Sequence, residues 1–356
     1  MTTTRKKILF SMIVVIFTVS TLLTIIEGGS WLLYNHVQPS TGLLNEVCKE
    51  FYMYTRKVIQ LTDIGVHDKE LGYVLKPGHH KFSNLEFEHN FTVNSLGVRG
   101  DERDLKQPDF VILGDSYAMG WGVEDAECFP KRLEKKLNRK VLNLAISSYG
   151  TSREFEILKR SKVKPKAIII QYCRNDLDEN LKFISENYQL ETMSQQSYED
   201  LKIYHEKISK YFPFKYTRKL FVVMVRNYKR KLLNKTKRET RDIQKEGDAF
   251  LDIIKYYRKD FPITPIYVLE LNTPGLNFNN GEFISYLNQH INKNELKYLK
   301  TVSLHEEMKE KEFFYIYDDH LRAVGHEYVA SKLYNSLKSY PFKYLQKPGS
   351  NTSLKN

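Results

Sequence analysis

Four short apolar runs, separated by longer amphipathic stretches, restrict the fold of this 356-residue chain more than any other feature. These runs are residues 110–113, 141–144, 167–170 and 266–269. Segments this short that are apolar on both faces are typical of buried strands in a parallel sheet. Helical patterns lie between and after them, at 129–137, 151–160, 249–257 and 325–337. This alternation predicts an α/β fold with a doubly wound parallel sheet.

Polar residues follow three of these runs, at the points where the chain leaves the predicted sheet. Ser116 comes just after the first run, the small-residue loop 143–151 follows the second, and Asn175 follows the third. The carboxyl ends of parallel strands share one edge, where ligands bind in such folds. Taken singly, each feature has an ordinary structural explanation as a helix cap, a strand-to-helix connection or a loop-holding turn.

A histidine with two acidic neighbours lies near the C-terminus, in Asp318-Asp319-His320. An imidazole next to a carboxylate is a general base with a group that orients it. Asn175 could donate to a developing oxyanion, and so could backbone N–H groups of the 143–151 loop. Together with the Ser116 hydroxyl, these groups are the components that acyl transfer requires.

As a set, these motifs resemble the SGNH hydrolases, also called GDSL-like esterases and lipases. The matching pieces are Gly114-Asp115-Ser116, the loop from Asn143 to Gly150, Asn175-Asp176, and Asp318 to His320 with Gly325-His326. The preceding region resembles a membrane-anchored bacterial branch of that family, through residues 71–73, 94–99 and 120–123. The resemblance covers roughly residues 68–337 and implies a flavodoxin-like sheet.

By this resemblance, Ser116 is the nucleophile, His320 the base and Asp318 its acid partner. The oxyanion donors would be the Ser116 backbone, the Asn175 side chain and one backbone N–H of the 143–150 loop. The chain has no G-x-S-x-G motif, which excludes the ordinary α/β-hydrolase nucleophile turn.

The chain departs from the family pattern at two places. The usual glycine five residues after the loop asparagine is Ser148 here, with Gly150 two residues further on, so either could supply the N–H. The family commonly places its acid three residues before the histidine, where this chain has Tyr317. Asp318 lies two before, a spacing found in some carbohydrate-acetylating relatives, and Asp319 is the less favoured alternative.

The first long apolar segment predicts a membrane anchor. Residues 8–26 carry no charged side chain over 19 residues, and a helix of that length spans about 28 Å of a bilayer core of about 30 Å. Arg5, Lys6 and Lys7 precede it, which predicts a cytoplasmic N-terminus and an extracytoplasmic, periplasmic or cell-surface domain. The alternative is a cleaved signal peptide, but the run is longer than usual and lacks an A-x-A site.

These features divide the chain into five predicted parts: a cytoplasmic N-terminus at 1–7, an anchor at 8–26, an extracytoplasmic arm at 27–105, a hydrolase domain at 106–340 and a tail at 341–356. An insertion is predicted within the hydrolase domain at about 178–245. Alternating polar and apolar residues at 85–93 predict a strand in the arm.

Positive charge is concentrated in residues 207–245, which hold nine Lys and five Arg against Glu239 and Asp242. This segment alone carries as much net charge as the whole chain, +12. We expect a basic helical insertion on the rim of the site that faces anionic lipid headgroups. The alternative is a solvated helical hairpin. Nucleic acid is disfavoured as a partner, because the anchor places this domain outside the cytoplasm.

The remaining composition indicates a globular protein, and no metal or organic cofactor is implied by the sequence. The chain is 41% hydrophobic and 13% aromatic, unlike a disordered sequence. Its three cysteines, Cys48, Cys128 and Cys173, exclude a disulfide scaffold and a four-cysteine zinc site. His79-His80 and His326 show no metal-ligand spacing.

The sequence thus predicts a membrane-tethered extracytoplasmic serine esterase or acyltransferase. The expected substrate is an acyl ester, above all an O-acetyl group, on a glycan or another envelope polymer, and this expectation depends on the family resemblance. Two alternatives remain: a phospholipase or lysophospholipase that takes lipid from the adjacent bilayer, and a non-catalytic glycan-binding assembly protein with the same fold. The sequence predicts no oligomeric state.

Overall fold

A computed structural model describes residues 3–36, 64–232, 241–272, 281–293, 296–304 and 311–338. Its centre is a five-stranded parallel sheet with the strand order β6-β5-β7-β8-β9. The strands are β5 (Phe110–Leu113), β6 (Val141–Asn143), β7 (Ala167–Tyr172), β8 (Ile266–Glu270) and β9 (Leu299–Val302). The first strand lies between the second and third, as in flavodoxin-like doubly wound folds. The predicted fold class is confirmed.

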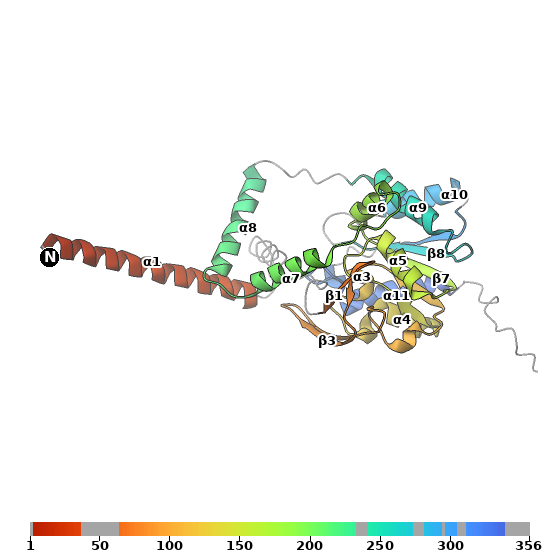
Figure 1. Ribbon diagram of the computed structural model, residues 1–356, viewed down its shortest axis with the longest axis horizontal. Helices are drawn as coiled ribbons and strands as arrows, with labels where there is room; N and C mark the ends of the chain where they lie inside the picture. Colours follow the sequence, from red (N-terminus) through yellow and green to blue (C-terminus); the bar gives the residue numbers. More distant parts are fainter. Residues whose placement is uncertain are drawn as a thin grey trace, which may run out of the picture.

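Helices cover both faces of the sheet (Figure 1). On one face, Phe110 and Ile112 pack with side chains of α4 (Phe129–Leu137) and α11 (Ala323–Leu337). On the other, Val111 and Leu113 pack in a cluster that includes four helices: α5 (Thr151–Ser161), α6 (Asp176–Ser185), α9 (Ile243–Tyr257) and α10 (Glu282–Lys293). Burial on both faces explains why the central strands are continuous apolar runs.

The four predicted helices are confirmed, although α9 begins at Ile243 rather than at residue 249. The prediction missed the edge strand β9, where Lys300 is exposed and Thr301 half-buried between two buried residues. An edge strand has one neighbour, so its composition need not be apolar throughout. The short elements are α3 (Ser116–Met119) and the 3₁₀ turns η2 (Glu102–Leu105), η3 (Asp125–Glu127) and η4 (Lys311–Phe313).

Two antiparallel hairpins form most of the arm at residues 64–105, while residues 27–36 of the predicted arm belong to the N-terminal helix. Strand β1 (Gly65–Asp68) pairs with β2 (Gly72–Leu75), and β3 (Gly78–Ser83) pairs with β4 (Glu88–Val93). The strand predicted at 85–93 therefore begins three residues later. Asn84 Oδ1 accepts hydrogen bonds from the N–H groups of Glu86 and Phe87, at 2.9 and 3.0 Å, which forms a turn instead. Residues 37–63 of the predicted arm, with Cys48, and the tail at 341–356 lie outside the described residues.

Helix α1 (Thr3–His36) extends away from the rest of the molecule (Figure 1). By length and composition, it could cross a membrane. The basic insertion forms α7 (Gln195–Ser209) and α8 (Lys215–Leu232), while residues 233–240 lie outside the described part.

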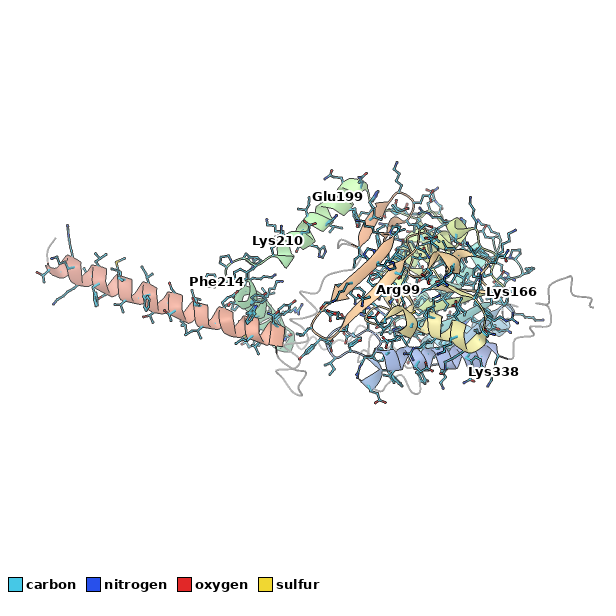
Figure 2. The ribbon with its side chains drawn as sticks, turned by 90° about the horizontal axis from the view of Figure 1, so that it is seen from below. Arg99, Lys166, Glu199, Lys210, Phe214 and Lys338 are labelled. Carbon is cyan, nitrogen blue, oxygen red and sulfur yellow. The ribbon has the colours of Figure 1, made fainter. Side chains whose placement is uncertain are left out.

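Helix α8 lies across the C-terminal part of α1 (Figures 1 and 2). The Glu27 carboxylate of α1 accepts hydrogen bonds from the N–H groups of Tyr216 and Thr217 at the start of α8, at 3.2 and 2.8 Å. Helix α8 lies beside α1 and away from α3 (Figure 1), so the expected position of this part of the insertion on the site rim is wrong. Arg241, at its far end, is also not part of a lipid-facing surface, because it is buried and pairs with Glu246 and Glu270.

Candidate active site

The turn after β5 presents Ser116 at the carboxyl edge of the sheet. Gly114 has a φ of +157°, and a Cβ there would lie 2.7 Å from both Ala118 Cβ and Gln171 Oε1, so only glycine fits. Asp115 then caps α3, because its Oδ1 accepts the Tyr117 N–H at 3.0 Å. Ser116 is the first residue of this short helix, with 9% of its surface exposed.

The structure brings Ser116, His320 and Asp318 together across 204 residues of sequence. His320 Nε2 lies 2.7 Å from Ser116 Oγ, and His320 Nδ1 hydrogen-bonds with Asp318 Oδ1. Of the two acids considered, Asp318 is thus the one joined to the imidazole. Asp319 occupies the turn between them with a φ of +67°, and its carbonyl accepts the Tyr117 hydroxyl at 3.2 Å.

Asn175 precedes α6 at the end of β7, on the other side of the nucleophile turn. Its exposed side chain donates from Nδ2 to Asp115 Oδ2 at 3.3 Å. This bond uses one of the two N–H groups of the amide. Burial raises the pKa of Asp115, and the Tyr117 N–H, the His320 ring and the Asn175 amide oppose that rise. The predicted oxyanion donor therefore lies beside the residue that precedes Ser116.

The two donor candidates in the loop after β6 have different surroundings. The Gly150 N–H already donates to Glu179 Oε1 at 3.1 Å. Ser148 is exposed and has a φ of +63°, in the left-handed region that favours glycine, the residue of the pattern that the loop resembles. The loop is held from the arm, since the Tyr73 hydroxyl donates to the Ser147 carbonyl at 2.8 Å. The Gly150 N–H is therefore the less favoured of the two donor candidates.

Sequence reasoning missed Gln171, which supports the nucleophile turn from β7. Its Oε1 accepts the N–H groups of Asp115 and Ala118, at 3.2 and 3.1 Å, on either side of Ser116. The available signal was a single amide in a strand whose six residues are all buried. A fully buried polar side chain needs a partner, and here the partner is the turn. Asn143 has a similar role, because its Nδ2 donates to the Ala118 carbonyl at 2.9 Å.

The arm also reaches the site, which the sequence did not indicate. Glu86, in the turn between β3 and β4, accepts three backbone N–H groups from Ile316, Tyr317 and Asp318, at 2.7, 2.8 and 2.7 Å. Asn84 Nδ2 donates to Asp318 Oδ2 at 3.3 Å. The nearest sequence signal, the alternation at 85–93, predicted a strand rather than a contact.

His326 does not belong to the hydrogen-bonded series of Ser116, His320 and Asp318. It is fully buried, and its Nδ1 accepts the Phe129 N–H, at 3.2 Å, at the start of α4. Burial and the nearby Arg99 and Arg132 hold the pKa of His326 well below its ordinary value. Within the described ranges, no group of three or more His, Cys, Asp or Glu side chains could hold a metal ion.

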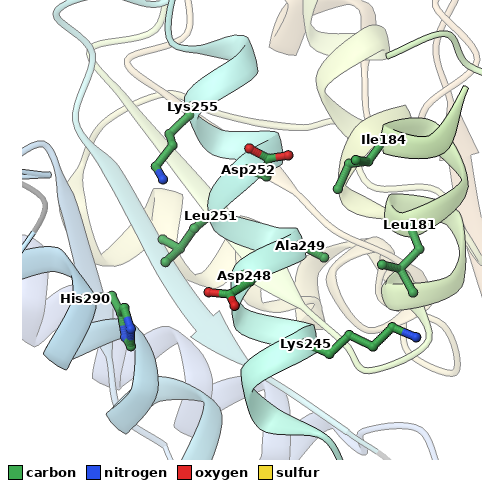
Figure 3. A pocket seen from close by; sticks show the side chains of 9 residues that line it. All are labelled: Leu181, Ile184, Lys245, Asp248, Ala249, Leu251, Asp252, Lys255 and His290. Atoms are coloured by element: carbon green, nitrogen blue, oxygen red, sulfur yellow. The ribbon is translucent and has the colours of Figure 1, made fainter. Parts of the chain in front are cut away.

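A groove of about 470 Å³ lies between α6, α9 and α10 and is separate from these residues (Figure 3). Its two carboxylates have partners, since Asp248 accepts the Tyr286 hydroxyl at 2.6 Å and Asp252 accepts the Tyr188 hydroxyl at 3.0 Å. None of the predicted site residues lines it. The candidate site is therefore defined by the hydrogen-bonded series at the edge of the sheet.

A hydrogen-bonded series of serine, histidine and aspartate can perform nucleophilic attack on a carbonyl carbon. An imidazole that is bonded to a serine hydroxyl can remove the proton as the oxygen attacks a carbonyl carbon. A carboxylate on the other ring nitrogen sets the tautomer and stabilises the imidazolium that forms. Amide donors next to the serine can stabilise the negative oxygen of a tetrahedral intermediate.

No family model and no curated protein matches the chain. Similar solved structures include an active-site mutant of a family two carbohydrate esterase from Clostridium thermocellum, with 13% identity, a TM-score of 0.40 and coverage of 66% of this chain and 65% of that one. Another is named for the G-D-S-L lipolytic family, from Desulfitobacterium hafniense, with 10% identity, a TM-score of 0.37 and coverage of 64% and 97%. The chain thus spans just under two thirds of the esterase. The second of these structures carries the name of the family that the motifs resemble, the GDSL-like hydrolases.

Proposed function

We propose that this protein is a membrane-tethered serine esterase or acyltransferase of the SGNH type. The observation that carries the proposal is the hydrogen-bonded series from Ser116 Oγ through His320 to Asp318. The series lies where β5 and β7 are neighbours, at the point where the strand order reverses. Doubly wound folds bind their ligands at this point.

In the proposed reaction, Ser116 Oγ attacks the acyl carbonyl carbon while His320 Nε2 takes the hydroxyl proton. Asp318 stabilises the imidazolium. The Ser116 and Ser148 N–H groups and the remaining N–H of the Asn175 amide donate to the tetrahedral oxyanion. The C–O bond to the alcohol then breaks as His320 returns the proton to it. Water, or a sugar hydroxyl in a transferase, attacks the acyl-serine and restores Ser116.

The substrate that we propose is an O-acyl group, above all O-acetyl, on a glycan or envelope polymer. Support comes from the motif resemblance and from the anchor, which would hold the domain beside the cell envelope. The uncharged segment 8–26 lies within α1, and Arg5, Lys6 and Lys7 precede it. We therefore propose a cytoplasmic N-terminus and an extracytoplasmic site. A reporter fused after Asn356 should be active only outside the cytoplasm; cytoplasmic activity would contradict this topology.

A lysophospholipase is the second candidate, and one observation favours it: α8 exposes apolar side chains next to α1, which would bring the domain close to lipid. Hydrolysis assays on an acetylated glycan and on a lysophospholipid, run side by side, distinguish the two substrates. A preference for the lipid would replace the glycan proposal and leave the reaction type unchanged.

The deciding experiment treats the full chain in nanodiscs with a fluorophosphonate and maps the labelled peptide. We expect one labelled serine, Ser116, together with hydrolysis of p-nitrophenyl acetate. Ser116→Ala should lose both, while Ser185→Ala, a matched change at an exposed serine of α6, should keep both. Unchanged hydrolysis by Ser116→Ala would remove the nucleophile assignment and favour the non-catalytic alternative.

A further inference from the structure

Helix α8 is fixed to α1 along one side. The Glu27 carboxylate accepts the Thr217 hydroxyl at 2.7 Å in addition to two N–H groups of the first turn of α8. The rings of Tyr34 and Tyr216 lie 5.5 Å apart, and Val223 is fully buried. A carboxylate at a helix N-terminus satisfies N–H groups that otherwise lack partners. The start of α8 is therefore held near residues 27–34 of α1, directly after the uncharged segment.

A second side of α8 is apolar and exposed. Phe221, Met224, Tyr228 and Leu232 are each more than half exposed. They are spaced by three, four and four residues, which places them on one face of the helix. Phe214, labelled in Figure 2, and Tyr211 add exposed aromatic rings just before the helix. A continuous group of exposed apolar side chains marks a contact with a partner or a membrane.

Cations accompany this apolar face. Lys207, Lys210, Arg218 and Lys229 are exposed around the start and along the length of α8. We infer that α8 lies in the surface of the bilayer that α1 crosses, with the face of Phe221, Met224, Tyr228 and Leu232 inserted and these cations toward anionic headgroups. The inference depends on the proposed tether and names a second, interfacial contact with the membrane. Its position across α1 fits a helix in the plane of that surface (Figure 1).

The test labels the full chain, in nanodiscs with anionic lipid, with a fluorophore at Met224→Cys. Matched labels are placed at Ile263→Cys, which is 90% exposed on the hydrolase domain, and at Ile16→Cys in α1. All three variants also carry Cys48→Ser, so that the label reacts only at the introduced cysteine. The other two cysteines, Cys128 and Cys173, are buried. A nitroxide lipid should quench residue 224 severalfold more than residue 263, and less strongly in zwitterionic lipid.

The possible outcomes distinguish failure of the interfacial-helix inference from failure of the proposed membrane anchor. Quenching at 16 but no more at 224 than at 263 would overturn the interfacial helix alone. Protection of 224 only in nanodiscs that hold two copies would assign the face to a second chain, which also overturns it. Absence of quenching at 16 would overturn the tether and, with it, the interfacial helix.

A different observation carries a second proposal, which concerns the loop that holds Asp318. Residues 316–318 have their three N–H groups bonded to the single Glu86 carboxylate. Asn84 donates to Asp318 Oδ2, which leaves Oδ1 for His320. The loop is closed at its base by the Phe314–Leu321 bridge and by the Tyr315 N–H, which donates to the His320 carbonyl at 2.9 Å. Residues 316–318, between these points, are the ones that Glu86 holds. The arm turn therefore supplies the contacts to the part of the loop that carries the acid carboxylate.

We propose that Glu86 and Asn84 are positioning residues that hold Asp318 against His320. This deepens the proposed function and adds an element from the arm to the site. The half-buried Glu86 carboxylate accepts three N–H groups, and hydrogen bonds to an ionised acceptor are stronger than neutral ones. Burial raises the pKa of Glu86, and the three N–H groups oppose that rise. Small displacements of a catalytic group lower turnover, while ground-state binding of a small ester depends little on the base.

The test compares Glu86→Gln and Glu86→Ala in the full chain, with p-nitrophenyl acetate as the substrate. Glu88→Gln is the matched control on the same hairpin, where Glu88 is exposed and pairs with Lys81 at 2.7 Å. We expect kcat to fall about 10- to 100-fold in the alanine variant, with KM unchanged. The glutamine variant keeps one acceptor oxygen and should lose less. The control should match the unaltered chain.

A second readout keeps the result independent of catalysis. The His320 Nδ1–H bonded to Asp318 should give a low-field proton signal in the unaltered chain and lose it in Glu86→Ala. Full kcat and an unchanged signal in both variants would overturn the proposal. If Glu86→Ala does not fold, Glu86→Gln and Asn84→Ala decide it by the same readouts. If the unaltered chain does not hydrolyse the ester, the proposed function fails, while the proton signal still decides the positioning role.

Discussion

The two halves of the candidate site are built in different ways. Ser116 and Asn175 follow neighbouring strands of a regular sheet, and Gly114 and Gln171 hold the Ser116 turn from within that sheet. Asp318 and His320 lie in an irregular loop that the arm holds through Glu86, 232 residues away from Asp318 in the sequence. The nucleophile half is thus positioned by secondary structure, and the acid–base half by side-chain contacts across the chain.

This difference determines how easily a substitution displaces the side chains of each half. The strands next to Ser116 are buried on both faces, so their positions are fixed by close packing. The 316–320 loop is held by separate hydrogen bonds, three of them to the Glu86 carboxylate, and the loss of these three can displace it. We expect changes in the residues that support the acid–base loop to displace it more readily than changes in the packed strands displace Ser116.

The largest effect should come from the pair that joins the two halves. Ser116→Ala and His320→Ala should each lower kcat by about 10⁶-fold, and the double variant should be no worse than either one, because these residues act as a unit. Ester hydrolysis by the three proteins measures this. Additive losses would show that the two halves work separately and would contradict the proposed reaction.

The next effect tests the acid alone. Asp318→Asn should lower kcat by about 10⁴-fold, because the amide favours the wrong tautomer of the His320 ring. Asp319→Asn is the matched control, since only its neighbour Asp318 is bonded to the imidazole nitrogen. A severe loss in Asp319→Asn with a mild one in Asp318→Asn would move the acid role to Asp319.

A smaller effect is expected at the donor end of the nucleophile half. Asn175→Ala should lower kcat by about 10²–10³-fold with little change in KM, because one donor to the oxyanion is lost. Thermal melting of the variant serves as the check on folding, since Asn175 also donates to Asp115. A raised KM with normal kcat would show that Asn175 binds the substrate rather than the transition state.

The smallest effect should come from Ser148→Gly. The φ of +63° at this position costs an L-residue free energy that glycine avoids, so the free energy of unfolding should rise by at most about 1 kcal/mol. Turnover should stay the same, because glycine keeps the backbone N–H. Denaturant unfolding and ester hydrolysis measure the two quantities. A large loss of turnover would show that the serine hydroxyl takes part in the reaction.

Predictions from sequence were best where one segment decides its own structure. The apolar runs at 110–113 and 167–170 became β5 and β7, and Ser116 lies at the edge where strand order placed it. The strand at 85–93 was misjudged because the Asn84 side chain competes with strand pairing, a contact that alternation does not show. The position of α8 was mispredicted for a similar reason. The Glu27 carboxylate of α1 bonds to the start of α8, and this contact between distant segments is not visible in the local sequence.

The sequence by itself determined the parallel α/β core, the helix that is long and apolar enough to cross a membrane, and the residue types for acyl chemistry. Periodicity and local turn chemistry act over a few residues, so one segment is enough to reveal them. Only the tertiary structure decided that Asp318 rather than Asp319 bonds to His320, that Glu179 occupies the Gly150 N–H, and that the arm holds the acid loop. Each of these contacts is a hydrogen bond, which forms only at a short distance and a narrow angle. Backbone torsions, or a partner far away in the chain, decide whether that geometry is reached. The spacing of residues in a local segment reveals neither the torsions nor the distant partner.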